Sequence, residues 1–132
     1  MNQLVASMRA AVSGDVGAVA YLANVLHDKL VEAGSHAGRL TVTPEAVLRA
    51  LESYRRREVS ASDINRWAWF VMRGYIPGNR DGPLWPVAID YKEDVEDEIA
   101  AVLSRLTELG DEIDGTLEPG ELDELVRRLA AG

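Results

Sequence analysis

The fold of this chain depends most on one segment, residues 60–73, which has the sequence SASDINRWAWFVMR. Ser60 is followed three residues later by Asp63, a pattern typical of a capped helix start. Apolar side chains then occupy nearly every face of the helix: Ile64, Trp67, Ala68, Trp69, Phe70, Val71, Met72 and Tyr75. A helix that is apolar on most sides is usually buried, so this segment predicts the centre of a helical bundle.

The residues before this segment predict three more helices. Thr43 is a good N-cap and Pro44 suits the first helical position, so a helix is expected to begin there. Residues 1–34 contain two runs of helical periodicity, and we expect the second run to end at Gly34, a common C-terminal cap. The apolar faces of these two runs are formed by Leu4, Met8, Ala11 and Val12, and by Val16, Val19, Leu22, Leu26 and Leu30. Residues 35–42 show no helical stripe and predict a connection, in which residues 39–42 form the longest stretch that is typical of a strand.

The residues after this segment predict a loop and two further helices. Residues 75–89 hold three prolines and two glycines, which interrupt helix, but enough apolar residues to form an ordered loop. Asp90, with Glu93 three residues later, predicts the next helix start, and Gly110 its end. Pro119 predicts the start of the last helix. The expected inward stripes are Val95, Ile99, Val102, Leu103, Leu106 and Leu109, then Leu122, Leu125, Val126 and Leu129.

These patterns together predict an all-α fold, a single-domain helical bundle of five or six helices with one proline- and glycine-rich loop. The expected parts are the N-terminal helices (1–34), the central helices (43–74), the ordered loop (75–89) and an acidic C-terminal helix pair (90–130). A chain of 132 residues is long enough to bury a core of its own.

Charge is distributed very unevenly along the chain. Residues 90–132 contain 14 acidic and 4 basic side chains, a net charge of −10, whereas residues 1–89 contain 8 acidic and 10 basic, a net charge of +2; together they account for the total of −8. An acidic half repels phosphate backbones, so direct nucleic-acid binding is not expected. It attracts basic proteins, although acidic helix faces also serve solubility alone.

The composition of the chain limits which cellular compartment and which side-chain chemistry we expect. The chain contains no cysteine, so disulfides and thiolate chemistry are excluded. The first residues do not resemble a signal peptide, and no apolar stretch approaches the roughly 20 residues of a membrane helix. The sequence therefore predicts a cytoplasmic protein that acts away from membranes.

Several short patterns suggest chemistry, and each also has a structural explanation that we favour. The aromatic run Trp67 to Phe70 suits a stacking platform, but its helical spacing favours core. His27 and His36 lack triad or metal partners and are expected at the surface or at helix ends. The basic run Arg55 to Arg57 suits phosphate binding, but also pairing with the acidic C-terminal helices. We therefore expect no enzyme activity and no cofactor, with a small enzyme based on His27 or the carboxylates as a remote alternative.

Residues 110–121 partly match a twelve-residue calcium loop. Gly115 occupies the position of the required glycine, and Glu121 that of the bidentate carboxylate. However, Gly110 stands where the anchoring aspartate belongs, and Pro119 lies within the span. We favour a turn between two acidic helices, and keep a degenerate, calcium-responsive helix pair as an alternative.

The turn Glu58-Val59-Ser60-Ala61-Ser62-Asp63-Ile64, within the helical region 51–71, resembles the early helices of bacterial immunity proteins of the colicin D type. That family has a charged residue, a β-branched residue, Ser or Thr, Ala, any residue, an acid and an apolar residue at this turn. The chain departs from the family in its long N-terminal region and its proline-rich loop. The resemblance implies a small helical bundle that blocks a tRNA-cleaving toxin with acidic side chains.

These observations lead to an acidic protein-binding protein, an immunity- or antitoxin-type inhibitor that occludes a basic partner such as a toxin nuclease domain. The matching turn does not itself carry inhibitory residues, so the binding patch is assigned on charge alone. Its expected members are Asp94, Asp97, Glu98, Glu108, Asp111, Glu112 and Asp114. The alternative is a structural or regulatory module that acts through homodimerisation or through the apolar loop around Trp85.

Overall fold

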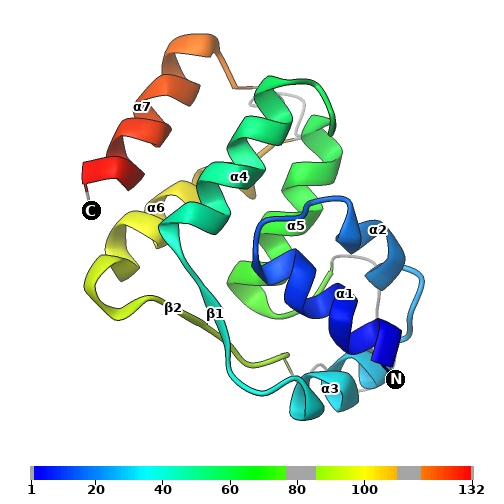
Figure 1. Ribbon diagram of the computed structural model, residues 1–132. Helices are drawn as coiled ribbons and strands as arrows, with labels where there is room; N and C mark the ends of the chain where they lie inside the picture. The colour runs from blue at the N-terminus through cyan, green and yellow to red at the C-terminus, as the bar shows by residue number, and fades with distance from the viewer. Residues whose placement is uncertain (1, 77–85, 110–116, 132) are drawn as a thin grey trace.

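The computed structural model describes residues 2–76, 86–109 and 117–131 and confirms the all-α fold. Seven α-helices, one 3-10 helix (η1) and a two-stranded sheet occur in these ranges (Figure 1). Their bounds are α1 Asn2–Val12, α2 Ala18–Leu22, α3 His27–His36, β1 Leu40–Val42, α4 Pro44–Arg55, α5 Ala61–Arg73, β2 Ile89–Tyr91, η1 Glu93–Val95, α6 Glu96–Leu106 and α7 Pro119–Ala131. The described part of the chain therefore has one α-helix more than the upper number expected from periodicity.

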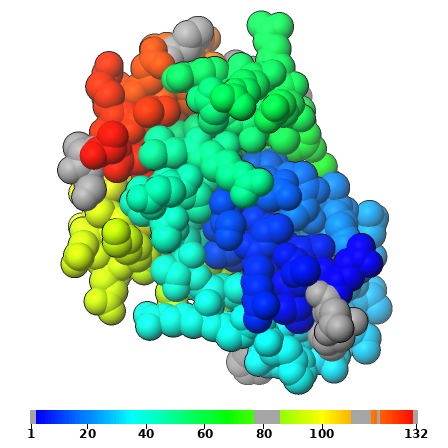
Figure 2. Space-filling view, in the orientation of Figure 1, coloured from blue at the N-terminus to red at the C-terminus, as the bar shows by residue number. Residues whose placement is uncertain are grey.

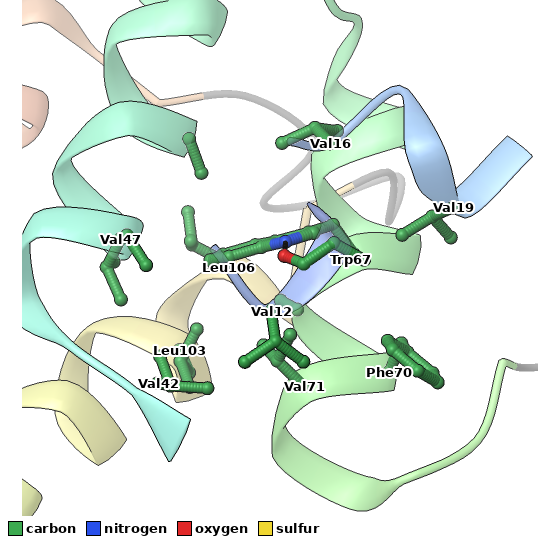
Figure 3. Close-up of a cluster of buried hydrophobic side chains, with 14 of the residues drawn as sticks. Val12, Val16, Val19, Val42, Val47, Trp67, Phe70, Val71, Leu103 and Leu106 are labelled. Atoms are coloured by element: carbon green, nitrogen blue, oxygen red, sulfur yellow. Dashed lines mark hydrogen bonds between the residues drawn. The ribbon is translucent and has the colours of Figure 1, made fainter. Parts of the chain in front are cut away.

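Helix α5 lies at the centre of the core, as its sequence predicts (Figure 1). Trp67 is completely buried, and its indole Nε1–H donates a hydrogen bond of 2.7 Å to the carbonyl oxygen of Ala11 near the end of α1. Side chains from several elements surround this indole (Figure 3), among them Val12, Val47, Val71 and Leu106. The core explanation of Trp67 and Phe70 is thus confirmed, whereas Trp69 is only partly buried.

The two central helices begin where their capping residues predict. The Thr43 side chain accepts a hydrogen bond from the Ala46 N–H at the start of α4. At the start of α5, Ser60 and Asp63 form a reciprocal capping box, in which each side chain accepts from the other residue's backbone N–H. These bonds satisfy donors that would otherwise lack partners in the first helical turn.

The N-terminal region packs onto the same core, but its second helical run is broken in two. Helix α2 ends at Leu22 and α3 begins at His27, with Leu26 in extended conformation before it. Leu26 is therefore 55% exposed, and its prediction as a core residue is wrong. Gly34 does not end the helix either, because α3 continues to His36. A Cβ on Gly34 would lie 3.0 Å from Val87, so this glycine serves close packing instead.

A short parallel sheet replaces two segments that the sequence assigned to a connection and a helix start. Leu40 of β1 aligns with Ile89 of β2, and Val42 aligns with Tyr91. Asp90 therefore lies in a strand, and α6 begins only at Glu96, after η1. The prediction of a helix from Asp90 is wrong because pairing with a distant strand decides the conformation of this segment. Ile76 and Val87 of the expected loop are buried, whereas residues 77–85, with Trp85, lie outside the described residues.

The C-terminal helices α6 and α7 bury their predicted stripes to different extents. Val95, Ile99, Val102, Leu103 and Leu106 are all buried. Helix α6 ends at Leu106, so Leu109 is buried from beyond the helix rather than within it. The final helix α7 begins at Pro119, as expected, and buries Leu122 and Leu129 more fully than Leu125 and Val126. None of the helices in the described ranges is long and apolar enough to cross a membrane.

Gly74 allows a stability test with a matched control. It ends α5 with φ 75°, and a Cβ at this position would lie 2.4 Å from the carbonyl oxygen of Val87. Gly38 has a similar φ of 77°, but a Cβ there would meet nothing within 4 Å. Both alanine variants carry the same backbone strain, so Gly74→Ala should cost about 2 kcal/mol or more beyond Gly38→Ala in urea unfolding. Equal losses would contradict the close approach of Val87 to α5.

Candidate functional site

Five carboxylates gather where η1 passes into α6, and we call them the acidic rim: Glu93, Asp94, Glu96, Asp97 and Glu98. The local fold explains their position. Val95 and Ile99 are buried and anchor the turn to the core, so the side chains between them are directed outward. All five are exposed except Glu98, which is partly buried. In Figure 2 the yellow segment that contains these residues forms part of one edge of the molecule.

The acidic rim is a dense run of carboxylates without basic partners in the described part of the chain, five within six positions of the chain. No Lys or Arg within residues 2–76, 86–109 and 117–131 forms an ion pair with any of the five carboxylates. Elsewhere in the chain, arginines neutralise single acids, as Arg39 does for Asp90 and Arg66 for Asp63. The rim therefore concentrates negative charge that no cation of the described residues pairs with directly.

Two features accompany this concentration of negative charge: the dipole of helix α6, which stabilises it, and a partly buried tyrosine beside it. Glu96, Asp97 and Glu98 occupy the first turn of α6, where the positive end of the helix dipole stabilises negative charge. Tyr91, at the end of β2, flanks the rim and is partly buried. Burial raises the pKa of Tyr91 above its ordinary value of 10.0, against a weaker opposite effect of Arg73, so the phenol stays protonated at neutral pH. A half-buried tyrosine beside charged groups is a common anchor in protein interfaces.

The residues expected to form the acidic patch lie at two separate places. Asp94 and Asp97 are exposed in the rim, and Glu98 is beside them. Glu108 follows the opposite end of α6, and its carboxylate lies 3.3 Å from Arg105 in an exposed ion pair. Asp111, Glu112 and Asp114 lie outside the described residues. Glu93 and Glu96 complete the rim; the sequence places them in the same run of acids, which is expected to face solvent or a partner, but the expected patch does not include them.

Glu121 occupies the last position of the calcium-loop pattern, and its carboxylate already pairs with an arginine side chain. Arg105 Nε lies 2.6 Å from one carboxylate oxygen, and Arg105 Nη2 lies 3.1 Å from the other. The hydrogen bonds from Arg105 lower the pKa of Glu121 below its ordinary value of 4.5, against an opposing effect of burial. Residues 110–116 lie outside the described part, and among the described residues no group of three or more acidic or histidine side chains is placed to hold a metal ion.

Both histidines lie at ends of helix α3. His36 is exposed at the end of α3, whereas His27 is buried at the start of the same helix, so its expected surface position is wrong and its helix-end position is confirmed. Arg55 pairs with Asp123 of α7 at 2.6 Å, as the pairing explanation predicts. Arg56 pairs with Glu52 of its own helix.

Arg57 has a backbone conformation that the sequence did not predict. Its φ is 61°, the left-handed region, and it is the one non-glycine residue with positive φ in the described ranges. Arg57 N–H donates to the Tyr54 carbonyl and Glu58 N–H donates to the Ser53 carbonyl, which is the Schellman pattern at the end of α4. Glycine usually occupies this position, and another residue costs about 1 kcal/mol by comparison. The same turn borders a pocket of about 720 Å³ between α4 and α7.

No protein-family model, curated protein or solved structure matches the chain. The class that fold and surface define is an all-α domain with an acidic rim that forms no ion pair with the described residues. The likeness of residues 51–71 to immunity proteins of the colicin D type remains an expectation from the sequence.

The bond between Arg105 and Glu121 predicts a pH-dependent contribution to stability. A carboxylate with a lowered folded pKa stabilises the fold above its unfolded pKa, and this contribution is lost as pH falls through the folded pKa. At pH 7, Glu121→Gln should therefore lower the free energy of unfolding by about 0.5–1 kcal/mol, because the pair is partly exposed to solvent. Urea titrations should show this difference disappear as pH falls below 4.5.

Glu124→Gln is the matched control, since Glu124 is exposed on the same helix and has no ion pair within the described residues. It should have little effect at either pH. A Glu121→Gln effect that persists unchanged in acid would mean that packing rather than charge accounts for the contribution of Glu121.

Proposed function

We propose that this protein is an acidic protein-binding protein, an immunity- or antitoxin-type inhibitor that covers a basic surface of a nuclease-like partner. One observation carries the proposal, namely that the five rim carboxylates have no cationic partner among the described residues. Each carboxylate offers acceptors to Arg or Lys, and Arg binds carboxylates with two parallel hydrogen bonds. A nucleic-acid cleft is rich in these two residues.

The charge of the rim acts first on the encounter with such a partner. Exposed ion pairs contribute only about 0.2–1 kcal/mol each, so the rim cannot supply the whole affinity. Its larger effect is to speed association and to exclude acidic or neutral partners. Partly buried Tyr91 and Glu98 would then provide contacts that become fully desolvated at the interface. The proposal therefore combines electrostatic selection by the rim with an anchor at its edge.

The proposed inhibitor works without cofactor and without direct binding of nucleic acid, because the same charge that attracts a basic protein repels phosphate. The lack of cysteine is compatible with a reducing compartment, and the proposal places the complex in the cytoplasm. Homodimerisation is the competing proposal. In the described ranges Leu26 is the one large apolar side chain that is strongly exposed, and a single such residue is normal for a monomer.

The proposal predicts a specific loss on charge reversal. The full chain would be used to capture proteins from its source cells at low salt, and the partner would then be purified. Asp94→Lys combined with Asp97→Lys should weaken binding about tenfold or more, mainly through slower association measured by stopped flow. Raising the salt concentration should weaken binding of the original protein and reduce this difference, because exposed charges are screened.

A double variant on α3 provides the control. Asp28→Lys with Glu32→Lys changes the net charge by the same amount at two exposed positions of α3, and it should leave association nearly unchanged. If the two double variants weaken binding equally, total charge rather than the rim is responsible. Recovery of only the protein itself, insensitive to salt, would replace the inhibitor proposal with homodimerisation. Inhibition of nuclease activity of the purified partner would identify the inhibitor class.

A further inference from the structure

The pocket between α4 and α7 is lined by apolar side chains and by an arginine in the left-handed conformation that forms no ion pair within the described residues. Its lining includes Tyr54, Val59, Leu117 and Leu122 on the apolar side, and Arg55, Arg57, Glu58 and Asp123 on the charged side. Its volume of about 720 Å³ falls within the range of small-molecule sites. In Figure 1 the end of α4 and the start of α7 lie at the same end of the molecule, away from η1.

Most polar groups at the pocket already have partners. Arg55 pairs with Asp123 at 2.6 Å, and the Tyr54 hydroxyl accepts a hydrogen bond from the Leu117 N–H. The Ser60 hydroxyl caps α5. These contacts hold the walls in place. They leave Arg57 as the guanidinium at the pocket with no hydrogen bond or ion pair to any described residue.

Arg57 also has a strained backbone conformation, so its lack of a partner among the described residues points to a role in binding. A glycine would occupy the left-handed position at the end of α4 without strain. The arginine therefore disfavours the folded chain at this turn, and no hydrogen bond or ion pair of its side chain within the described residues offsets that effect. Strained residues of this kind gather at ligand sites, where the side chain is useful at a fixed place.

We propose that this pocket binds a small amphipathic carboxylate, with its apolar body against Val59, Leu117 and Leu122 and its carboxylate on Arg57. A guanidinium matches a carboxylate with two parallel hydrogen bonds. Arg55 is already paired with Asp123, and Glu58 adds a negative charge to the lining, so a multiply charged ligand such as phosphate is not favoured. A single negative charge on an apolar body fits both the charges and the walls. This activity is separate from the acidic rim and does not depend on a protein partner.

Decanoate is a suitable probe, with decanol as its uncharged counterpart. Decanoate would be titrated into the ¹⁵N-labelled full chain below the concentration at which it aggregates. We expect saturable shifts of the amide signals of Val59, Leu117 and Leu122. Arg57→Gly should weaken decanoate binding at least tenfold, because it removes the guanidinium. The same variant should raise Tm by about 3 °C, because it relieves the left-handed strain, so a failure to fold cannot explain the loss of binding.

Arg56→Gln is the matched control, since Arg56 belongs to the same basic run but does not line this pocket. It should leave decanoate affinity unchanged, whereas Arg57→Gln should weaken it as Arg57→Gly does. Decanol binding should be insensitive to all three variants. The proposal is overturned if the pocket amides do not respond, if Arg57→Gly and Arg56→Gln bind decanoate equally well, or if Arg57→Gly lowers Tm.

Discussion

The burial of Trp67 is the constraint on which the rest of the structure depends. The indole occupies the centre of the core, and its N–H requires an acceptor there, because a buried donor without one is costly. The Ala11 carbonyl meets this need at 2.7 Å and also accepts the Gly14 N–H at the turn after α1. One hydrogen bond therefore fixes the N-terminal helices against α5, and the remaining elements pack around this joined pair (Figure 3).

The distribution of charge follows from this packing. Arginines on α4 and α6 lie near acids that the fold brings to them, as Arg55 lies near Asp123 and Arg105 near Glu121. The rim at η1 and the start of α6 is held outward by Val95 and Ile99 and has no basic neighbour of this kind among the described residues. Folding thus gives some acidic residues an arginine partner and leaves the rim carboxylates without one among the described residues.

The rim and the α4–α7 pocket illustrate two ways in which a small helical domain can carry a function. The rim is a charged surface whose effect reaches across solvent and acts on the rate and choice of association. The pocket is a short-range site in which packed apolar walls and a single guanidinium determine what fits. The two sites use different residues, and each includes a feature that folding alone does not require. These features are carboxylates at the rim without an ion pair among the described residues, and a left-handed arginine at the pocket.

The sequence by itself determined the features that depend on neighbouring residues. The capping residues Thr43 and Ser60 set the starts of α4 and α5, and helical periodicity identified most of the core, including Trp67. The run of acids at residues 93–98 was also evident, because charge can be counted along the chain. These features are local, so short stretches of sequence contain the information that decides them.

Only the tertiary structure decided the features that join distant residues. Pairing of Leu40 with Ile89 made strands from a presumed connection and a presumed helix start. Contact with Val87 explains a glycine inside α3, and the break before α3 left Leu26 exposed. The candidate functional sites also depend on tertiary structure. The spacing of residues in the sequence did not reveal which carboxylates would form ion pairs with arginines, or that Arg57 would border a pocket. The physical reason is that pairing, desolvation and strain depend on what the folded chain brings together, which no local pattern encodes.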